Sequence, residues 1–182
     1  SKPRNDNIIE ALGQALANLR TLSFPTELND NSRRYFTALA PRVAPEVGEA
    51  MRRILVDPQD PAANAILNRS VSYNAMLRTT CIPTMVEGGH AVNAQPQRAR
   101  AVINCRSLPG SPVSAIQAAL VKAVDNPRIT VTPMIAGPDR APAPPLTPEV
   151  MGPIEKVAPA VFPGVPVTPM QETFGTDAGR LT

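Results

Sequence analysis

Two segments of alternating apolar and polar residues flank a loop rich in glycine, asparagine and proline, and this arrangement constrains the fold more than any other feature. Residues 80–87 alternate with a period of two, and residues 99–104 do the same on the far side of the loop. A period of two is typical of β-strands, and two strands joined by a turn-forming loop pair antiparallel. The sequence therefore predicts a β-hairpin, and its second strand ends at Arg106.

Length, composition and charge limit the class of protein. The 182 residues suffice for one ordinary domain with an appendage. Hydrophobic residues make up 43% of the chain but aromatic residues only 3%, so the core must be built from small aliphatic side chains. The net charge is +3, but lysines and arginines occur singly or in pairs, and we expect no nucleic-acid partner. No apolar run approaches the ~18 residues of a membrane span, so we expect no membrane association.

Apolar residues recur at three- and four-residue spacing in several segments, which predicts amphipathic helices. The first helix runs from about Ile8 to Leu22. A helical insertion follows at about residues 25–76, in which prolines separate the shorter helical patterns. The remaining helices are predicted at residues 31–39, 45–55 and 61–67 within the insertion, and at residues 112–124 and 148–161 after the hairpin.

The order of the elements outside the insertion predicts the fold class. Alternation at residues 128–134 predicts a third strand, which gives the order helix, strand, strand, helix, strand. This is an α+β (α/β) arrangement of the ferredoxin-like kind, with an antiparallel sheet and flanking helices. Such a layer needs one more strand before its first helix, so either the domain has a bare edge or a strand is missing.

A proline-rich connector after residue 134 marks a domain boundary. We therefore expect one domain at residues 1–134, and a linker with a partial further domain at residues 135–182. A short strand is predicted at residues 165–169. One helix and one strand cannot form an independent core.

Two cysteines, Cys81 and Cys105, fall on the two predicted strands and lie opposite each other if the hairpin is centred near Asn93. A cross-strand disulfide is geometrically conceivable, but directly opposed residues often hold their Cβ atoms farther apart than the ~3.8 Å that a disulfide prefers. Free cysteine is also a common small core residue. We favour two free thiols, with the disulfide as the alternative that an oxidising compartment would select.

Candidate functional residues are suited to recognition and not to catalysis. With one histidine and no CxxC motif, the chain cannot supply a zinc ligand set or a Cys–His dyad, so no catalytic or metal-binding residue is assigned. The Arg106 guanidinium can donate two parallel hydrogen bonds to a carboxylate, although most arginines are simply solvated on the surface. Asn93 can donate its amide to an oxyanion, or it is an ordinary turn asparagine. The backbone N–H groups near Gly175 and Thr176 can meet an anion. A lone loop histidine such as His90 is more often structural.

In their order and spacing, these residues resemble the M20 metallopeptidases, a family of di-zinc amidohydrolases that includes glutamate carboxypeptidases and aminoacylases. The resemblance covers nearly the whole chain. The segment SKPRNDNIIEALGQAL is similar to the one that follows the family's Gly-Gly-His-Ser strand. TMVEGGHAVNAQPQRARAVINCRSLPG is similar to the family's lid hairpin, and FGTDAGR to its Gly-Gly-Thr-Asp loop. The insertion is similar to that of a subgroup with an enlarged lid.

The resemblance implies a lid that dimerises by extending its sheet and covers a catalytic domain with two zinc ions. It implies that Arg106 grips the carboxylate of a peptide or N-acyl amino acid substrate, that Asn93 contacts the same substrate, and that Gly175 and Thr176 bind it through their backbone. Residues 135–182 would then be a partial catalytic-domain segment. The family's zinc ligands and its base glutamate fall outside this chain, so we expect the isolated chain to bind no zinc and to be inactive.

Together these expectations describe the substrate-recognition and dimerisation portion of an exopeptidase that hydrolyses an amide bond next to a free carboxylate. The alternative belongs to a different class of protein. It is a non-catalytic dimerisation or binding module that has kept the lid fold.

Overall fold

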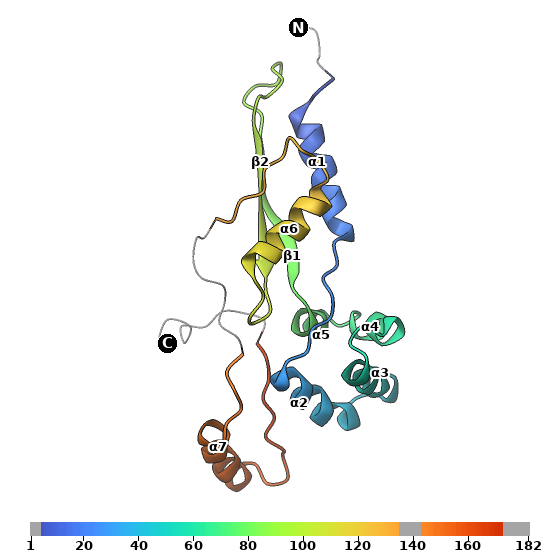
Figure 1. Ribbon diagram of the computed structural model, residues 1–182, viewed down its shortest axis with the longest axis vertical. Coiled ribbons are helices and arrows are strands. Elements are labelled where there is room, and N and C mark those ends of the chain that lie inside the picture. Colours follow the sequence, from blue (N-terminus) through green and yellow to red (C-terminus); the bar gives the residue numbers. More distant parts are fainter. Residues whose placement is uncertain (1–4, 135–142, 173–182) are drawn as a thin grey trace. The chain divides into compact units, whose positions relative to one another are not determined.

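The structure, a computed structural model, describes residues 5–134 and 143–172. The chain divides into two compact units (Figure 1). Unit 1 consists of Ser1–Phe24 and Thr80–Ala141, and unit 2 consists of Pro25–Thr79 and Pro142–Thr182. Over the described ranges, no helix combines the length and the apolar character that crossing a membrane requires.

The predicted β-hairpin is confirmed and forms the sheet of unit 1. Strand β1 (Thr80–Gly88) pairs antiparallel with β2 (Ala99–Arg106). The ladder runs from the pair Thr80 and Arg106 at the open end, called the root here, to the pair Gly88 and Ala99 beside the connecting loop, called the tip. A bulge interrupts the register at Thr84, directly after a proline that has no N–H group for the ladder.

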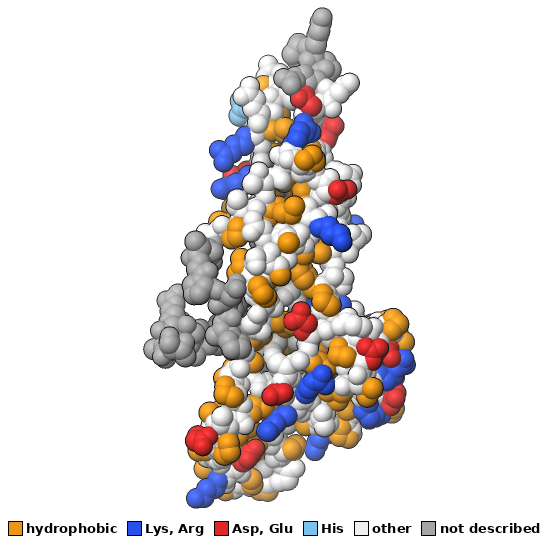
Figure 2. Space-filling model, in the orientation of Figure 1, with side chains coloured by type: hydrophobic (Ala, Val, Ile, Leu, Met, Phe, Trp, Pro, Cys, Tyr) orange, Lys and Arg blue, Asp and Glu red, His pale blue; other side chains and the backbone are white. Residues whose placement is uncertain are grey.

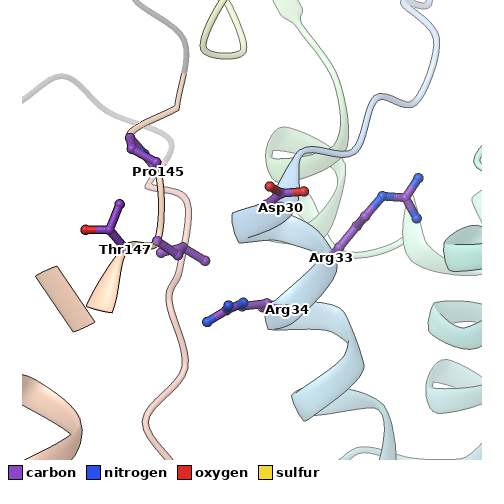
Figure 3. Close-up of a pocket in the computed structure, with 6 residues that line it drawn as sticks. Asp30, Arg33, Arg34, Pro145 and Thr147 are labelled. Atoms are coloured by element: carbon purple, nitrogen blue, oxygen red, sulfur yellow. The ribbon is translucent and has the colours of Figure 1, made fainter. Parts of the chain in front are cut away.

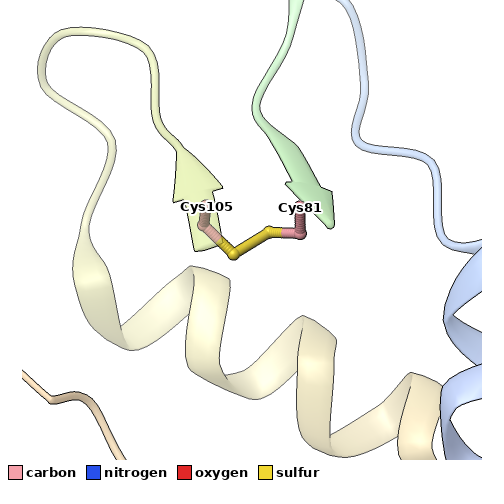
Figure 4. Close-up of a disulfide and its surroundings, with 2 residues drawn as sticks. All are labelled: Cys81 and Cys105. Carbon is pink, nitrogen blue, oxygen red and sulfur yellow. A yellow bond between two sulfur atoms is a disulfide. The ribbon is translucent and has the colours of Figure 1, made fainter. Parts of the chain in front are cut away.

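A disulfide joins Cys81 to Cys105 at the root of the hairpin (Figure 4). The two residues face each other in the ladder, as the centring of the hairpin near Asn93 predicts. Their Cα atoms lie only 4.1 Å apart, closer than in most opposed pairs, which lets the two sulfur atoms meet. The preference for two free thiols is therefore wrong, and the alternative of a bridge holds.

Two helices pack on the hairpin and complete the core of unit 1 (Figure 1). Helix α1 (Ile8–Asn18) begins at Asn7, whose side chain accepts the Ile9 N–H, and continues into a 3-10 turn, η1 (Leu19–Thr21). Helix α6 (Val113–Val124) follows the hairpin. The core buries Ala15, Leu19, Leu120 and Val124, with Ile103 and the disulfide packed against them. Both helices match their predicted positions.

The predicted third strand at residues 128–134 does not form. The sheet described in the structure has two strands, in the order β1-β2. Ile129 and Val131 nevertheless pack against the core of unit 1, and the Gln117 side chain donates a hydrogen bond to the Val131 carbonyl at 2.8 Å. The alternation in this segment therefore reflects the packing of Ile129 and Val131 against the core. The backbone hydrogen bonds to a neighbouring strand that would define a β-strand do not form in the described sheet.

Unit 2 is built from short helices separated by prolines, as the sequence predicts. Helices α2 (Asp30–Leu39), α3 (Pro45–Val56) and α4 (Pro61–Leu67) occupy the three predicted segments, and α5 (Val71–Leu77) is an additional helix that the pattern did not predict. Asn29 caps α2 in a reciprocal capping box with Ser32. Proline stands in the first turn of α3 and of α4, where its missing N–H group costs least.

The largest fully buried side chains of unit 2 form one core between these helices. Phe36, Met51, Ile54, Leu67 and Leu77 are fully buried. Tyr35 and Tyr73 pack edge-on against the Phe36 ring, with centroid distances of 5.3 and 6.0 Å. This core contains most of the few aromatic residues that the structure describes.

Hydrogen bonds bring the two ends of the insertion together. The Glu27 N–H donates to the Leu77 carbonyl at 2.8 Å. The buried Arg78 guanidinium donates to the Thr26 hydroxyl at 2.8 Å and to the Asn64 side-chain oxygen at 2.6 Å. Burial lowers the pKa of Arg78 from its ordinary value. Because both ends of the insertion meet, it folds as part of a unit of its own.

The segment after the proline-rich connector also belongs to unit 2. Helix α7 (Pro148–Val161) lies where the sequence predicts it. The predicted strand at residues 165–169 does not form. Instead, Gln171 accepts a hydrogen bond from the Asn29 side chain at 2.7 Å and donates one to the Met76 carbonyl at 3.3 Å. Side-chain hydrogen bonds thus hold this segment without a ladder.

Gly48 in α3 offers a test of the packing in unit 2. A Cβ atom at this position would meet the carbonyl oxygen of Ala40, so Gly48→Ala should lower the free energy of unfolding by about 1–3 kcal/mol through overpacking. The control is Gly13→Ala in α1, where a Cβ meets nothing within 4 Å and the better helix former should add about 0.5–1 kcal/mol. Chemical denaturation measures both, and stabilisation by Gly48→Ala would contradict this account of α3.

The disulfide offers a test of the hairpin. Its two cysteines lie 24 residues apart, so Cys81→Ala/Cys105→Ala should lower the free energy of unfolding by about 2–4 kcal/mol by releasing the loop in the unfolded chain. The parent sequence measured in reducing buffer is the matched control and should lose a similar amount. Equal denaturation midpoints for the oxidised, reduced and double-alanine proteins would show that the bridge does not hold the hairpin.

Candidate functional site

Arg106 lies at the root of the hairpin, where the backbone is fixed on both sides. The preceding residue, Cys105, is bridged to β1, and Leu108, two residues later, is buried. A turn with Gly110 at a positive φ of 80° follows, closed by a hydrogen bond from the Ser111 N–H to the Leu108 carbonyl at 3.2 Å. The guanidinium therefore extends from an anchored point while its side chain stays exposed.

The side chain of Arg106 shares a sheet face with three residues that are also free of the helices. Because side chains alternate along a strand, Thr80, Ile82, Asn104 and Arg106 lie on the face opposite to Cys81, Ile103 and Cys105. The second group packs in the core with α1 and α6. On the first face, Asn104 and Arg106 are exposed and Ile82 is 61% exposed. This face, called the open face here, is therefore not covered by α1 or α6.

Asn104 is a functional candidate that the sequence analysis did not single out. It stands two residues before Arg106, so both side chains project from the same face about 7 Å apart along the strand. An amide beside a guanidinium adds a neutral donor and an acceptor to a carboxylate site. Continuing the period-two alternation of residues 99–104 to residue 106 would have placed Asn104 and Arg106 on one face, and this signal was sufficient to identify the pair.

Asn93 lies in the loop at the tip of the hairpin. The Ala94 N–H donates to the Ala91 carbonyl at 3.4 Å, which closes a turn with Asn93 at one of its two central positions. Its side chain is exposed. Beside this turn, residues 87–90 and 94–100 line a hollow of about 930 Å³ that includes His90. An exposed ion pair between Glu87 and Arg100, at 3.1 Å, spans the two strands at the edge of this hollow.

Asn93 and Arg106 are not brought together within one chain. The seven residue steps of β2 from Ala99 to Arg106 alone span roughly 24 Å, and Asn93 lies beyond Ala99 in the loop. Gly175 and Thr176, the other two predicted substrate contacts, lie outside the described residues. The structure thus places two of the four predicted residues, and it places them at opposite ends of one ribbon.

A second hollow lies in unit 2 and is smaller. Asp30, Arg33, Arg34, Pro145, Leu146 and Thr147 line a volume of about 340 Å³ (Figure 3). Arg34 extends toward the segment that carries Thr147, whereas Arg33 donates to the Leu55 carbonyl at 3.0 Å. The Thr147 side chain also forms a hydrogen bond that lowers the pKa of Glu149 from its ordinary value. Two of the polar groups here are therefore already engaged within the protein.

The described residues do not form a zinc site. They contain no group of three or more histidine, cysteine, aspartate or glutamate side chains placed to hold a metal ion. Both cysteines are in the disulfide, and His90 lies in the exposed loop at the tip. Zinc binding needs about four such ligands in one place, so no chemical step through a metal is derived for these residues.

Comparison with known families identifies the chain. Residues 1–130 match the family model of the M20 peptidase dimerisation domain. No curated protein and no solved structure matches the chain. The matched residues include α1, the insertion, the hairpin and α6. Because the match covers more than half of the 182 residues, the chain belongs to the peptidase dimerisation domain family of the M20 peptidases.

Proposed function

We propose that this chain is the substrate-recognition and dimerisation portion of a di-zinc exopeptidase that cleaves an amide bond next to a free carboxylate. Its family places it with the peptidases and supports a homodimer. The observation that carries the specific proposal is the exposed Arg106 guanidinium, fixed at the root of the hairpin on the open face. Peptides and N-acyl amino acids both present the carboxylate that such a group recognises.

Arg106 supports this proposal through the chemistry of its side chain. A guanidinium donates two parallel N–H bonds to one carboxylate, and such charge-assisted bidentate pairs are stronger and more directional than neutral hydrogen bonds. No ion pair or hydrogen bond of Arg106 is found among the described residues, so its donors are available to a ligand. The disulfide in the adjacent residue holds the strand and reduces the ordering that binding requires.

The distance between Asn93 and Arg106 supports a role for two chains. A dipeptide spans about 7 Å, so it cannot touch both ends of a strand that is roughly 24 Å long. In a homodimer, however, the tip of one hairpin can approach the root side of the other chain. We therefore assign Arg106 to the substrate of its own chain and Asn93 to the substrate of the partner, where its amide donates to the developing oxyanion.

The catalytic chemistry belongs to other parts of the parent protein. Two zinc ions, held by residues outside the described ranges, would polarise the scissile carbonyl. Gly175 and Thr176 would donate their backbone N–H groups to the substrate. The described residues bind and orient the substrate, so the isolated chain is expected to have no hydrolase activity.

Substitution of Arg106 in the parent enzyme tests the proposed function. Arg106→Ala should lower kcat/KM for carboxylate substrates by about 30- to 1000-fold, equivalent to about 2–4 kcal/mol. Arg106→Lys should restore little of this loss, because lysine cannot form the bidentate pair with a carboxylate. Replacing the substrate carboxylate by a carboxamide should abolish the difference between Arg106→Ala and the parent enzyme.

The matched control is Arg100→Ala, which removes another exposed arginine of β2 whose partner is Glu87. We expect its kcat/KM to stay within about threefold, because exposed ion pairs contribute little. Unfolding midpoints of both variants establish that each is folded. Unchanged kinetics in folded Arg106→Ala would remove Arg106 from the site, and a parent without peptidase activity would favour the non-catalytic binding module.

A further inference from the structure

The open face of the hairpin carries three apolar side chains between its two polar ends. Ile82 stands opposite Asn104 in the ladder, and Met85 stands opposite Val102. Ile82 is 61% exposed, Met85 is 55% exposed, and Val102 is half-buried. None of the three belongs to the core that the described residues of unit 1 form with α1 and α6. These side chains, called the apolar patch here, are therefore not covered by the helices.

The bulge in β1 places Met85 in the apolar patch. Ile82 and Met85 are three positions apart, so in a regular strand they would project from opposite faces. The register shift between Pro83 and Met85 adds one residue to β1, so Met85 pairs with Val102 and projects from the open face. The Thr84 hydroxyl, at the bulge, donates to the Val102 carbonyl at 3.3 Å. The bulge thus gathers apolar side chains that regular alternation would divide between the two faces.

Charged groups lie at both ends of the apolar patch. At the root, the exposed Arg106 guanidinium extends from the anchored end of β2. Toward the tip, the next pair on the open face is Glu87 and Arg100, whose side chains form an exposed ion pair at 3.1 Å. Basic side chains and the histidine are visible at the tip end of the part that contains the hairpin (Figure 2). An exposed apolar patch with a polar rim is typical of a binding surface.

The spacing of these groups limits the shape of a ligand. The Cα atoms of Asn104 and Val102 lie roughly 7 and 14 Å from that of Arg106 along β2, at about 3.4 Å per residue. A ligand whose carboxylate is held by Arg106 and which extends toward the tip therefore lies over the apolar patch. The ion pair beyond the patch has matched charges and offers no second site for an anion. Charge complementarity thus favours a ligand with one terminal carboxylate and an apolar body.

An acyl chain fits the apolar patch better than a longer peptide does. An extended peptide carries an N–H and a C=O group about every 3.3–3.6 Å. The three side chains of the patch offer these groups no partner, and the backbone beneath them is paired in the ladder. Covering polar groups without a hydrogen bond costs free energy, whereas covering methylene groups is favourable. The patch therefore discriminates against a peptide that continues toward the tip.

We propose that the apolar patch is a subsite for the apolar acyl chain of an N-acyl amino acid whose carboxylate is held by Arg106. The inference rests on the proposed function and deepens it. It narrows the substrate class from any peptide or N-acyl amino acid to one whose acyl chain is long enough to reach Ile82 and Met85.

A series of acyl-chain lengths, measured with the parent enzyme, tests the proposal. The substrates share one amino acid and differ only in a linear acyl group, from acetyl upward. We expect kcat/KM to rise about twofold to fourfold for each added methylene until the chain passes the patch. The double variant Ile82→Ser/Met85→Ser should reduce this gain to less than about 1.5-fold per methylene, because the chain then lies over hydroxyl groups.

The matched control is Val86→Ser, another exposed aliphatic residue of β1. Val86 is 67% exposed and pairs with Ala101, so it projects from the face opposite to the apolar patch. Its gain per methylene should equal that of the parent enzyme. Unfolding midpoints establish that each variant is folded.

The other outcomes contradict the proposal. A parent enzyme whose kcat/KM does not depend on chain length, or an unchanged gain in the folded double variant, would overturn it. A double variant that is destabilised but keeps the gain would assign the patch to contacts within the parent protein. An equal effect of Val86→Ser would show that the open face is not responsible. Failure here is distinguishable from failure of the proposed function, because the dependence of activity on Arg106 and on the substrate carboxylate is measured separately, with the acetyl substrate.

Discussion

The antiparallel ladder between β1 and β2, locked by the Cys81–Cys105 disulfide, is the constraint on which the rest of unit 1 depends. Its register decides which side chains enter the core with α1 and α6 and which remain on the open face. A slip of one residue would turn Arg106 toward the helices and Cys105 toward solvent. The bridge therefore fixes the side of the sheet from which Arg106 projects, as well as the position of its backbone.

The insertion leaves this ladder undisturbed because its own ends are held together. The backbone bond between Glu27 and Leu77 and the contacts of Arg78 with Thr26 and Asn64 bring its first and last residues side by side. An insertion whose ends meet can be accommodated between α1 and β1 without pulling them apart. The insertion is thus an addition to the dimerisation domain and not a change in its sheet.

The sequence was most informative where periodicity coincided with clear stop signals. The repeats of α1, α3 and α7 predicted their positions, and the centring of the hairpin near Asn93 predicted the opposition of Cys81 and Cys105. The prediction of a strand at residues 128–134 was wrong. Alternation indicates which side chains are buried, but it does not show whether a neighbouring strand is present to pair with. The sequence did not predict the disulfide, because its formation depends on the distance between the two Cα atoms, and the spacing of the cysteines along the sequence does not reveal that distance.

For the candidate site, the sequence predicted the residue chemistry and the position of each residue in the hairpin, but not the anchoring of Arg106 by the adjacent disulfide. The side-chain types of Arg106 and Asn93 suggested anion recognition, and family membership supports a peptidase context. The predicted hairpin, centred near Asn93 and ending at Arg106, already implied that the two residues lie at opposite ends of one ribbon, and the ladder of the structure agrees. A paired strand holds the two residues apart. The hypothesis therefore changes: Arg106 and Asn93 of one chain no longer contact the same substrate, and each substrate is contacted by Arg106 of one chain and Asn93 of the other.

Complementation between subunits of the parent enzyme tests this account most directly. Arg106→Ala and Asn93→Ala chains are prepared separately, and the mixed dimer is purified with a different tag on each chain. If each substrate takes Arg106 from one chain and Asn93 from the other, the mixed dimer retains one intact site and about half of the parent activity, while both mutant homodimers are impaired. A mixed dimer no more active than the mutant homodimers would show that the two residues serve the same chain's substrate, or none, and would contradict the account.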